Sequence, residues 1–242
     1  MQASIEKIIE IINSSENIVF FGGAGISTES GIPDFRSTDG LYNQEYKYPP
    51  EKILSHSFFT MNPKEFYRFY KNKCILPMIN SEPNETHLAL KKLEDIGKLK
   101  AIVTQNIDDL HHKAKSKVIY ELHGTSFRNH CIKCNKEYSI EYIMNNKNDV
   151  PICECGGIIR PDIVLYEESL NSDVINRSIN AISNADCLII AGTSLVVYPA
   201  AGFINYYKGN KLILINKTNV PNEENIDYVY HGKATDVFKK FL

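Results

Sequence analysis

The sequence lacks a long apolar run, an excess of basic charge and a segment that resembles a signal peptide. No apolar run approaches the roughly 18 residues of a membrane-spanning helix, so we expect no membrane partner. The formal net charge of −2 gives no general attraction to nucleic acid, and we expect no nucleic-acid partner. The segment from Met1 to Glu6 has neither the basic nor the apolar region of a secretory signal. These absences predict a cytoplasmic protein.

The composition is otherwise that of an ordinary globular protein, with 43% hydrophobic and 23% charged residues. The 242 residues can bury a large core, either as one domain or as one domain with a sizeable insertion. Internal repeats and low-complexity tracts are absent. Six cysteines in a reducing compartment indicate metal or redox chemistry rather than disulfides.

Short apolar runs alternate with amphipathic segments along most of the chain. Helical spacing of apolar side chains predicts helices near 3–14, 87–96, 172–183, 199–207 and 234–241. The apolar runs predict strands at Ile18–Phe21, Leu99–Thr104, Val118–Leu122, Ile163–Tyr166, Cys187–Ala191, Leu212–Asn216 and Tyr228–Tyr230. This alternation favours an α/β fold with an open, mostly parallel sheet and helices on both faces.

Two stretches interrupt the alternation. Residues 50–79 are rich in aromatic side chains at helix-like spacing, which predicts a helical packing layer. Residues 125–159 carry four of the six cysteines and a polar run at 145–149, which indicates an inserted module. We therefore expect 1–37, 81–124 and 160–242 to form the sheet domain, and 38–80 with 125–159 to form a smaller one.

The clustered cysteines form two pairs, Cys131-x-x-Cys134 and Cys153-x-Cys155. Four thiolates give a tetrahedral zinc site with no open position, so a structural zinc ion is expected. A redox role is the alternative, although nothing around the pairs resembles a thioredoxin-type C-x-x-C after a strand. The other two cysteines, Cys74 and Cys187, are predicted to be buried apolar residues.

Polar residues follow most of the predicted sheet strands, where ligands bind in open α/β folds. These clusters are Gly22–Ser27, Gln105–Asp108, His123, Gly192–Ser194 and Asn216. Loops rich in Gly, Ser and Thr suit a phosphate-bearing ligand, and a dinucleotide is the natural candidate. The first glycine turn alone is a weak signal, because Thr28 stands where G-x-G-x-x-G has its third glycine, and a turn without a ligand stays open as the alternative.

His123 is the best candidate for a general acid or base, because imidazole titrates near neutrality and this one follows a strand. A structural role is the alternative for His123. His111 and His112 lie early in a predicted helix, where surface or capping roles are expected. The remaining four histidines have no polar neighbours in sequence: His56, His87, His130 and His231.

Taken together, these residues resemble the sirtuin family of NAD-dependent protein-lysine deacylases, and the bacterial branch in particular. The resemblance covers nearly the whole chain. It is carried by the four cysteines and by GAGIS (23–27), GIPDFR (31–36), TQNID (104–108), HG (123–124), IRPDIVLYEE (159–168), GTSLVVYPA (192–200) and IN (215–216). It implies a Rossmann-like NAD-binding domain and a small zinc-binding and helical domain.

The resemblance also implies roles for individual residues. His123 and Asn106 would be catalytic, and the acyl-lysine substrate would contact Val164, Tyr166 and Val196. The substrate peptide would add as a strand between 165–168 and 195–198. NAD would be bound by Gly23, Ala24, Thr28, Phe35, Arg36, Gln105, Asn106, Ile107, Asp108, His123, Thr193, Ser194, Asn216 and Ala234, while one structural zinc would be held by Cys131, Cys134, Cys153 and Cys155.

The implied reaction transfers the acyl group of a lysine to NAD. The acyl oxygen displaces nicotinamide from the ribose, and His123 then activates a ribose hydroxyl as general base. The products would be free lysine, nicotinamide and O-acyl-ADP-ribose. A neutral acyl group is expected, because Tyr70-x-x-Lys73 stands where an acidic acyl group would want Tyr and Arg. Another lysine deacylase, a protein ADP-ribosyltransferase and an NAD-sensing binding module are the alternatives.

Three positions depart from the family pattern. Gly22 replaces a threonine, which removes a hydroxyl near the cofactor, and Asp109 replaces a frequent glycine at a tolerant position. Glu167 replaces the glycine of F-G-E on the predicted peptide-binding strand, where a side chain would perturb peptide docking or require a changed backbone. The residues indicate no particular oligomeric state.

Overall fold

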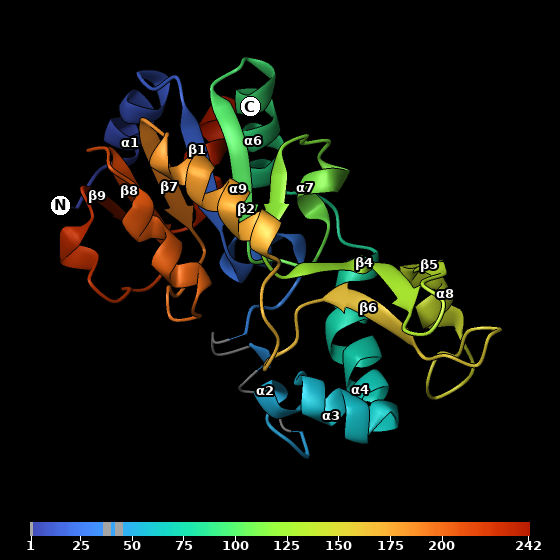
Figure 1. The fold of residues 1–242 in the computed structure, drawn as a ribbon. Coiled ribbons are helices and arrows are strands. Elements are labelled where there is room, and N and C mark those ends of the chain that lie inside the picture. The colour runs from blue at the N-terminus through green and yellow to red at the C-terminus, as the bar shows by residue number, and fades with distance from the viewer. Residues whose placement is uncertain (1, 36–39, 42–45) are drawn as a thin grey trace.

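The computed structural model describes residues 2–35, 40–41 and 46–242. Arg36, predicted to reach the phosphates of NAD, lies outside the described residues. Figure 1 shows two units, with the large sheet and its helices above and the helices α2 to α4 with strands β4 to β6 below. None of the described helices is long and apolar enough to cross a membrane.

The upper unit is built on a six-stranded sheet in the order β3-β2-β1-β7-β8-β9, in which every neighbouring pair is parallel. The chain builds the sheet outward from β1 in one direction, then returns to build from β7 in the other. Ligands bind where the strand order reverses in this way. The strands are β1 (Ile18–Gly22), β2 (Leu99–Thr104), β3 (Ile119–Glu121), β7 (Cys187–Ala191), β8 (Leu212–Asn216) and β9 (Tyr228–His231).

The central strands form because both of their faces are buried by helices. Phe20 packs with α1 (Ile5–Asn13), α6 (Glu85–Asp95) and α10 (Ala234–Phe238). Val19 and Phe21 point the other way, toward α9 (Ser172–Ser183) and the 3₁₀ segment η5 (Ala200–Tyr206). Continuous apolar strands are typical of parallel sheets covered on both faces. The predicted α/β fold is therefore confirmed.

The lower unit begins with a layer of short helices. They are α2 (Pro50–Ile53), α3 (His56–Met61), α4 (Pro63–Phe69), the π-helical segment η4 (Tyr70–Ile75) and α5 (Leu76–Ile79). Most of their aromatic pairs pack edge to face, as Phe66 and Tyr67 do, and both of these side chains are fully buried. The predicted aromatic packing layer is confirmed.

A three-stranded antiparallel sheet completes the lower unit. Its order is β5-β4-β6, with β4 (Gly124–Cys131), β5 (Glu137–Ser139), β6 (Ile159–Ile163) and the helix α8 (Ile140–Asn145). The predicted strand Ile163–Tyr166 is wrong, because β6 ends at Ile163 and belongs to this sheet. The run beyond it is apolar because Leu165 packs into the core of the lower unit, not because it joins the large sheet.

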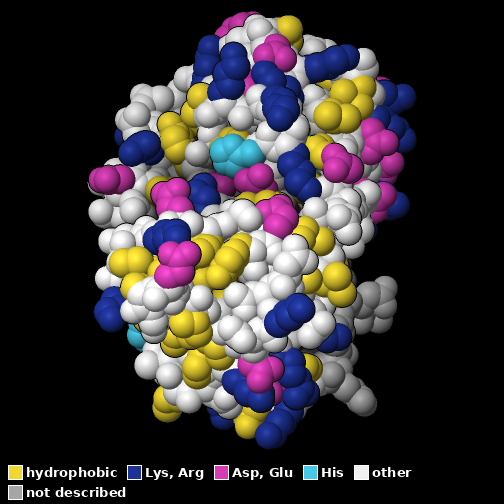
Figure 2. Space-filling model, turned by 90° about the vertical axis from the view of Figure 1, so that its right-hand side faces the viewer, with side chains coloured by type: hydrophobic (Ala, Val, Ile, Leu, Met, Phe, Trp, Pro, Cys, Tyr) yellow, Lys and Arg dark blue, Asp and Glu magenta, His cyan; other side chains and the backbone are white. Residues whose placement is uncertain are grey.

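Short elements connect these parts: η1 (Ala24–Ile26), η2 (Thr28–Ser30), α7 (Leu110–Lys113), η6 (Glu223–Asn225) and η7 (Lys239–Phe241). On the face shown in Figure 2, basic and acidic side chains are interspersed over both units.

Candidate functional site

A cleft of about 510 Å³ opens at the carboxyl ends of β1, β2, β7 and β8. Its position matches the point where the strand order reverses. All but one of the described residues predicted to bind NAD or the acyl-lysine line it: Gly23, Ala24, Thr28, Phe35, Gln105, Asn106, Ile107, Asp108, His123, Val164, Tyr166, Thr193, Ser194, Asn216 and Ala234. The exception is Val196, which is 45% exposed and lies outside the lining next to Val197.

The loop after β1 is held against the end of β7 by a contact between two glycines. The Gly25 N–H donates to the carbonyl of Gly192 at 2.8 Å. A Cβ on Gly192 would lie 2.4 Å from the backbone nitrogen of Ile26, and Gly192 also has a φ of +60°. Only glycine fits both requirements without strain. The two loops that border the cleft are therefore fixed to each other through their backbones.

The same loop presents unoccupied backbone donors to the cleft. The N–H groups of Ala24 and Thr28 make no hydrogen bond to the described part of the chain, and both residues line the cleft. The Thr28 hydroxyl turns back to the carbonyl of Gly25 at 3.0 Å. Free backbone N–H groups at the end of a parallel strand suit the phosphates of a dinucleotide.

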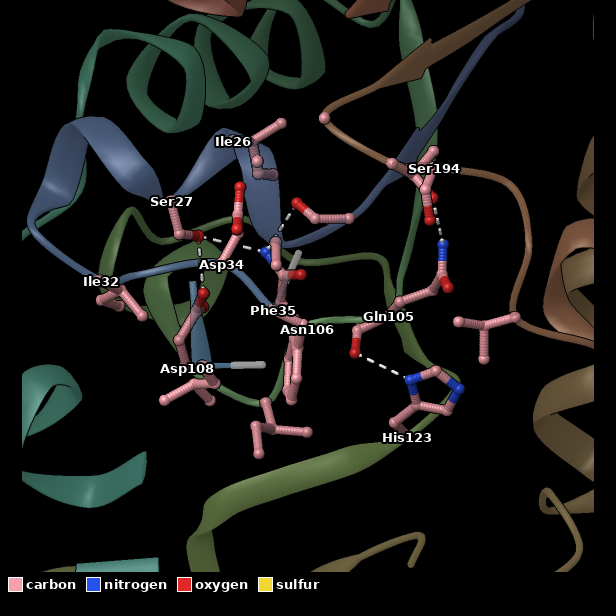
Figure 3. Close-up of a pocket in the computed structure, with 18 of the residues that line it drawn as sticks. Ile26, Ser27, Ile32, Asp34, Phe35, Gln105, Asn106, Asp108, His123 and Ser194 are labelled. Atoms are coloured by element: carbon pink, nitrogen blue, oxygen red, sulfur yellow. Dashed lines mark hydrogen bonds between the residues drawn. The ribbon is translucent and has the colours of Figure 1, made fainter. Parts of the chain in front are cut away.

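At the inner end of the cleft, Ser27, Asn106 and Asp108 form one hydrogen-bonded cluster (Figure 3). The Ser27 hydroxyl donates to Asp108 at 2.6 Å, and Asn106 Nδ2 donates to the Ser27 oxygen at 3.1 Å. Burial raises the pKa of Asp108, while the hydrogen bonds from Ser27 and from the Leu110 N–H oppose this shift. The cluster holds a buried carboxyl and a carboxamide in fixed positions.

His123 lies at the opposite side of the cleft, after β3 (Figure 3). Its Nδ1 is 2.9 Å from the carbonyl of Gln105, which can only accept, so Nδ1 carries the proton and Nε2 keeps its lone pair. Burial lowers the pKa of His123, which the hydrogen bond to Gln105 partly offsets. A neutral imidazole with a free Nε2 has the form that a general base requires.

The outer part of the cleft carries polar groups from β2, β7 and β8. Gln105 Nε2 donates to the Thr193 hydroxyl at 3.1 Å, which joins the ends of two strands. Asn216 ends β8, where its side chain donates to the carbonyl of Thr218 at 2.8 Å. Ala234 begins α10 and lines the same end of the cleft.

Glu167, which replaces a glycine of the family pattern, has a left-handed backbone with a φ of +76°. Its carboxylate accepts two hydrogen bonds from Ser57, from the backbone N–H and from the hydroxyl, both at 2.9 Å. These two bonds fix the Glu167 side chain to the start of α3. Of the other two departures, Asp109 has a left-handed backbone with a φ of +64°, and Gly22 does not line the cleft.

Ser27 belongs to the predicted polar cluster Gly22–Ser27, but no contact with NAD was predicted for it individually. The hydroxyl of Ser27, directly beside the predicted phosphate loop, was the available indication of a role in binding. The hydrogen bond to Asp108 could not be predicted, because the two residues are 81 positions apart in the sequence. The surface or capping role predicted for His111 is wrong, because the side chain is buried against Phe20 and His87. His112 is exposed as predicted, and its Nε2 lies 3.2 Å from Glu121.

The four clustered cysteines come together at the far end of the lower unit. Their sulfur atoms all lie within 4.8 Å of one another, with Cys131 and Cys155 at 3.4 Å and Cys134 and Cys153 at 3.7 Å. Zinc–sulfur bonds of about 2.3 Å in a tetrahedron place sulfur atoms at such separations. The C-x-C pair therefore fits a zinc ion as well as the C-x-x-C pair does, and the donor set is that of a structural site. Cys74 and Cys187 are buried, as predicted.

A parallel sheet with a polar cleft at its reversal point, beside a four-cysteine module, defines a dinucleotide-binding α/β protein. A model of the Sir2 family matches residues 23–199. The chain belongs to the Sir2 family, so the resemblance to sirtuins is confirmed.

Two bacterial proteins are similar to this chain over nearly its full length. A Clostridium perfringens protein named NAD-dependent protein deacetylase is 55% identical, with 100% of both chains covered. A Clostridium tetani protein of the same name is 57% identical over 96% of this chain and 94% of that one.

Two solved Sir2 structures superpose closely. One contains a p53 peptide and NAD+, with a TM-score of 0.87 and 38% identity over 98% of this chain and 97% of that one. The other contains a deacetylated p53 peptide and 3′-O-acetyl ADP-ribose, with a TM-score of 0.90 and 36% identity over the same shares.

Proposed function

We propose that this protein is an NAD-dependent protein-lysine deacetylase that produces nicotinamide and O-acetyl-ADP-ribose. The main support for this proposal is that one cleft brings together the groups that the reaction needs. It has free backbone donors at the β1 loop, a buried Ser27–Asn106–Asp108 cluster at its inner end and the free Nε2 of His123 opposite. Full-length relatives named NAD-dependent protein deacetylases support the same activity.

NAD supplies a leaving group, nicotinamide, and a ribose hydroxyl that receives the acetyl group. Asp108 and the Ile107 backbone would hold the nicotinamide carboxamide, and Asn106 would orient the ribose. The buried carboxyl is suited to this role because Ser27 and the Leu110 N–H already fix its orientation. His123 would take the proton from the ribose hydroxyl through Nε2.

The remaining predicted NAD contacts would hold the rest of the cofactor. The loop at Gly23, Ala24 and Thr28 would bind the diphosphate with Arg36, and Phe35 would cover the reactive ribose. Thr193, Ser194, Asn216 and Ala234 would bind the adenosine half, which agrees with their place along the outer cleft.

The acyl-lysine would enter between Val164 and Tyr166 on one side and the segment at Val196 on the other. Tyr166 pairs with the backbone of the 54–56 segment, with its N–H on the carbonyl of Leu54 and its carbonyl accepting from His56. The next residue, Glu167, makes no backbone hydrogen bond within the described part of the chain, and neither does Val196. These backbone groups are open to an added strand, as β-augmentation requires.

The test is to incubate the protein with NAD and an acetyl-lysine peptide and to identify all products by mass spectrometry. We expect free lysine peptide, nicotinamide and O-acetyl-ADP-ribose. His123→Ala should lower kcat by at least about 100-fold, the low end for loss of a general base. His112→Ala, which removes an exposed imidazole outside the cleft, is the matched control and should keep full activity.

The other outcomes identify the alternatives. A protein-bound ADP-ribose adduct would favour an ADP-ribosyltransferase, and faster turnover of a succinyl than of an acetyl peptide would favour another deacylase. NAD binding without nicotinamide release from any acyl peptide would favour an NAD-sensing module.

We also propose that residues 1–37, 81–124 and 160–242 form the NAD-binding domain, with 38–80 and 125–159 as the small domain. The two sheets support this division. A cytoplasmic location is proposed as well, because none of the six cysteines, all of which are described, forms a disulfide, and four of them are arranged for a metal.

A further inference from the structure

Asn84 connects helix α6 to the loop that borders the cleft. It is the N-cap of α6, 8% exposed, and its Oδ1 accepts from the Thr86 N–H at 3.0 Å. Its Nδ2 points away from the helix and donates to the carbonyl of Ile26 at 2.8 Å and to the hydroxyl of Ser30 at 3.0 Å. The cap needs only the oxygen, which Ser or Asp supplies as well. The amide nitrogen therefore serves the loop and not the helix.

The two groups that accept from Asn84 lie at either end of the part of the loop that lines the cleft. Ser27 and Thr28 lie between Ile26 and Ser30, and both line the cleft. The loop consists of two 3₁₀ turns of three residues each, η1 and η2. Such short turns have little stability of their own, so contacts from outside decide their conformation. Asn84 supplies two of these contacts without lining the cleft itself.

We propose that Asn84 is a positioning residue that holds the segment from Ile26 to Ser30 in the conformation that binds NAD. Through this segment it also fixes the Ser27 hydroxyl against Asp108. The inference rests on the proposed function for the identity of the ligand. It extends that function to a residue that does not touch the ligand.

The experiment separates the two ends of the Asn84 side chain. Asn84→Ser keeps an N-cap oxygen and loses both bonds to the loop, whereas Asn84→Ala loses the cap as well. NAD binding is measured by calorimetry, KM for NAD and for peptide by steady-state kinetics, and stability by urea unfolding. We expect Asn84→Ser to raise the Kd and KM for NAD on the order of tenfold, with peptide KM unchanged and stability nearer to wild type than that of Asn84→Ala.

Ser30→Ala provides a second variant that leaves α6 intact and removes one of the two acceptors. It should weaken NAD binding in the same direction by a smaller factor. Wild-type NAD affinity in both Asn84→Ser and Ser30→Ala would overturn the proposal and leave Asn84 as a helix cap. The calorimetric readout needs no turnover, so a wild-type protein that binds NAD but deacetylates no peptide would refute the proposed function and not this inference.

Discussion

The buried imidazole of His87 should make this protein sensitive to acid. His87 is fully buried in the first turn of α6, and burial lowers its pKa from 6.5 to about 3. Its ring centroid is 4.9 Å from that of His111, whose pKa burial also lowers, well below its usual value. Within the described part of the chain, neither ring has a carboxylate among its hydrogen-bond partners. The folded protein therefore resists protonation at both positions.

The sign and size of the effect follow from the pKa of His87. Because the pKa is lower in the folded state, the unfolded chain binds more protons between pH 6.5 and 3, and stability falls as the pH falls through this window. At pH 5 the difference corresponds to about 1.5 pH units at about 1.4 kcal/mol each, or about 2 kcal/mol. That is a large part of a typical net stability of about 5–15 kcal/mol.

His87→Gln tests this value. Glutamine is favoured at the same position of a capping box and does not titrate, so it can keep the helix start while removing the charge. Urea unfolding at pH 7 and pH 5 should show that the wild type loses about 2 kcal/mol more than the variant on acidification. Far-UV circular dichroism is the suitable signal, because the chain has no tryptophan.

His112→Gln is a control of opposite sign. His112 Nε2 donates a hydrogen bond to the Glu121 carboxylate, and this bond raises the pKa of His112. The pair therefore stabilises the protein below pH 6.5, and its contribution is lost as the pH rises through the raised value. His112→Gln removes this contribution, so the variant should lose more stability than the wild type when the pH is lowered. If the wild type and His87→Gln lose the same free energy between pH 7 and pH 5, the reasoning about His87 is refuted.

Gly192→Ala should lower the free energy of unfolding by about 1–2 kcal/mol from left-handed strain alone and should also weaken NAD binding, because its Cβ meets the loop after β1. Gly31→Ala, also left-handed but with no atom near the added Cβ, should show the strain without loss of NAD affinity in a calorimetric titration. Glu167→Ala should raise the KM for peptide and not for NAD, while Glu167→Gln, which keeps an acceptor for Ser57, should do so less; equal effects of both changes would contradict this. Zinc removal by a chelator should release one metal per chain and lower the melting temperature, and a metal-free protein with unchanged melting would count against a structural site. In a profile of kcat/KM against pH, the acid limb set by His123 should lie below 6.5, because burial lowers its pKa; a limb above 6.5 would exclude it as the base.

Local apolar pattern was enough to predict most of the large sheet. Leu99–Thr104, Cys187–Ala191 and Leu212–Asn216 were predicted with the bounds that the structure shows. Most residues of these strands are buried because helices cover both faces of the sheet, so their sequences are largely apolar, with Lys100 as an exposed exception. The prediction of a strand at Ile163–Tyr166 was wrong because an apolar run alone does not indicate in which hydrophobic core its side chains are buried.

The sequence predicted the site residues that lie at strand ends. It did not predict the residues whose roles depend on contacts with segments distant in the sequence. His123 and Asp108 follow strands, and the parallel topology brings such positions to one edge. The Asn84 bonds to Ile26 and Ser30 span more than 50 residues, and nothing local marks them. The burial of His111 escaped prediction for the same reason, since it depends on packing against β1 and α6.

The segment from Val164 to Glu167 joins parts of the cleft that lie on different units. The Val164 N–H donates to the carbonyl of His123 at 3.0 Å, while Glu167 binds Ser57 on α3. A peptide that orders this segment therefore also steadies the backbone of His123, beside the bound cofactor. Coupling of this kind is reciprocal, so NAD must tighten peptide binding by the factor by which the peptide tightens NAD. We therefore expect the protein to bind its two substrates cooperatively, so that each substrate raises the affinity for the other.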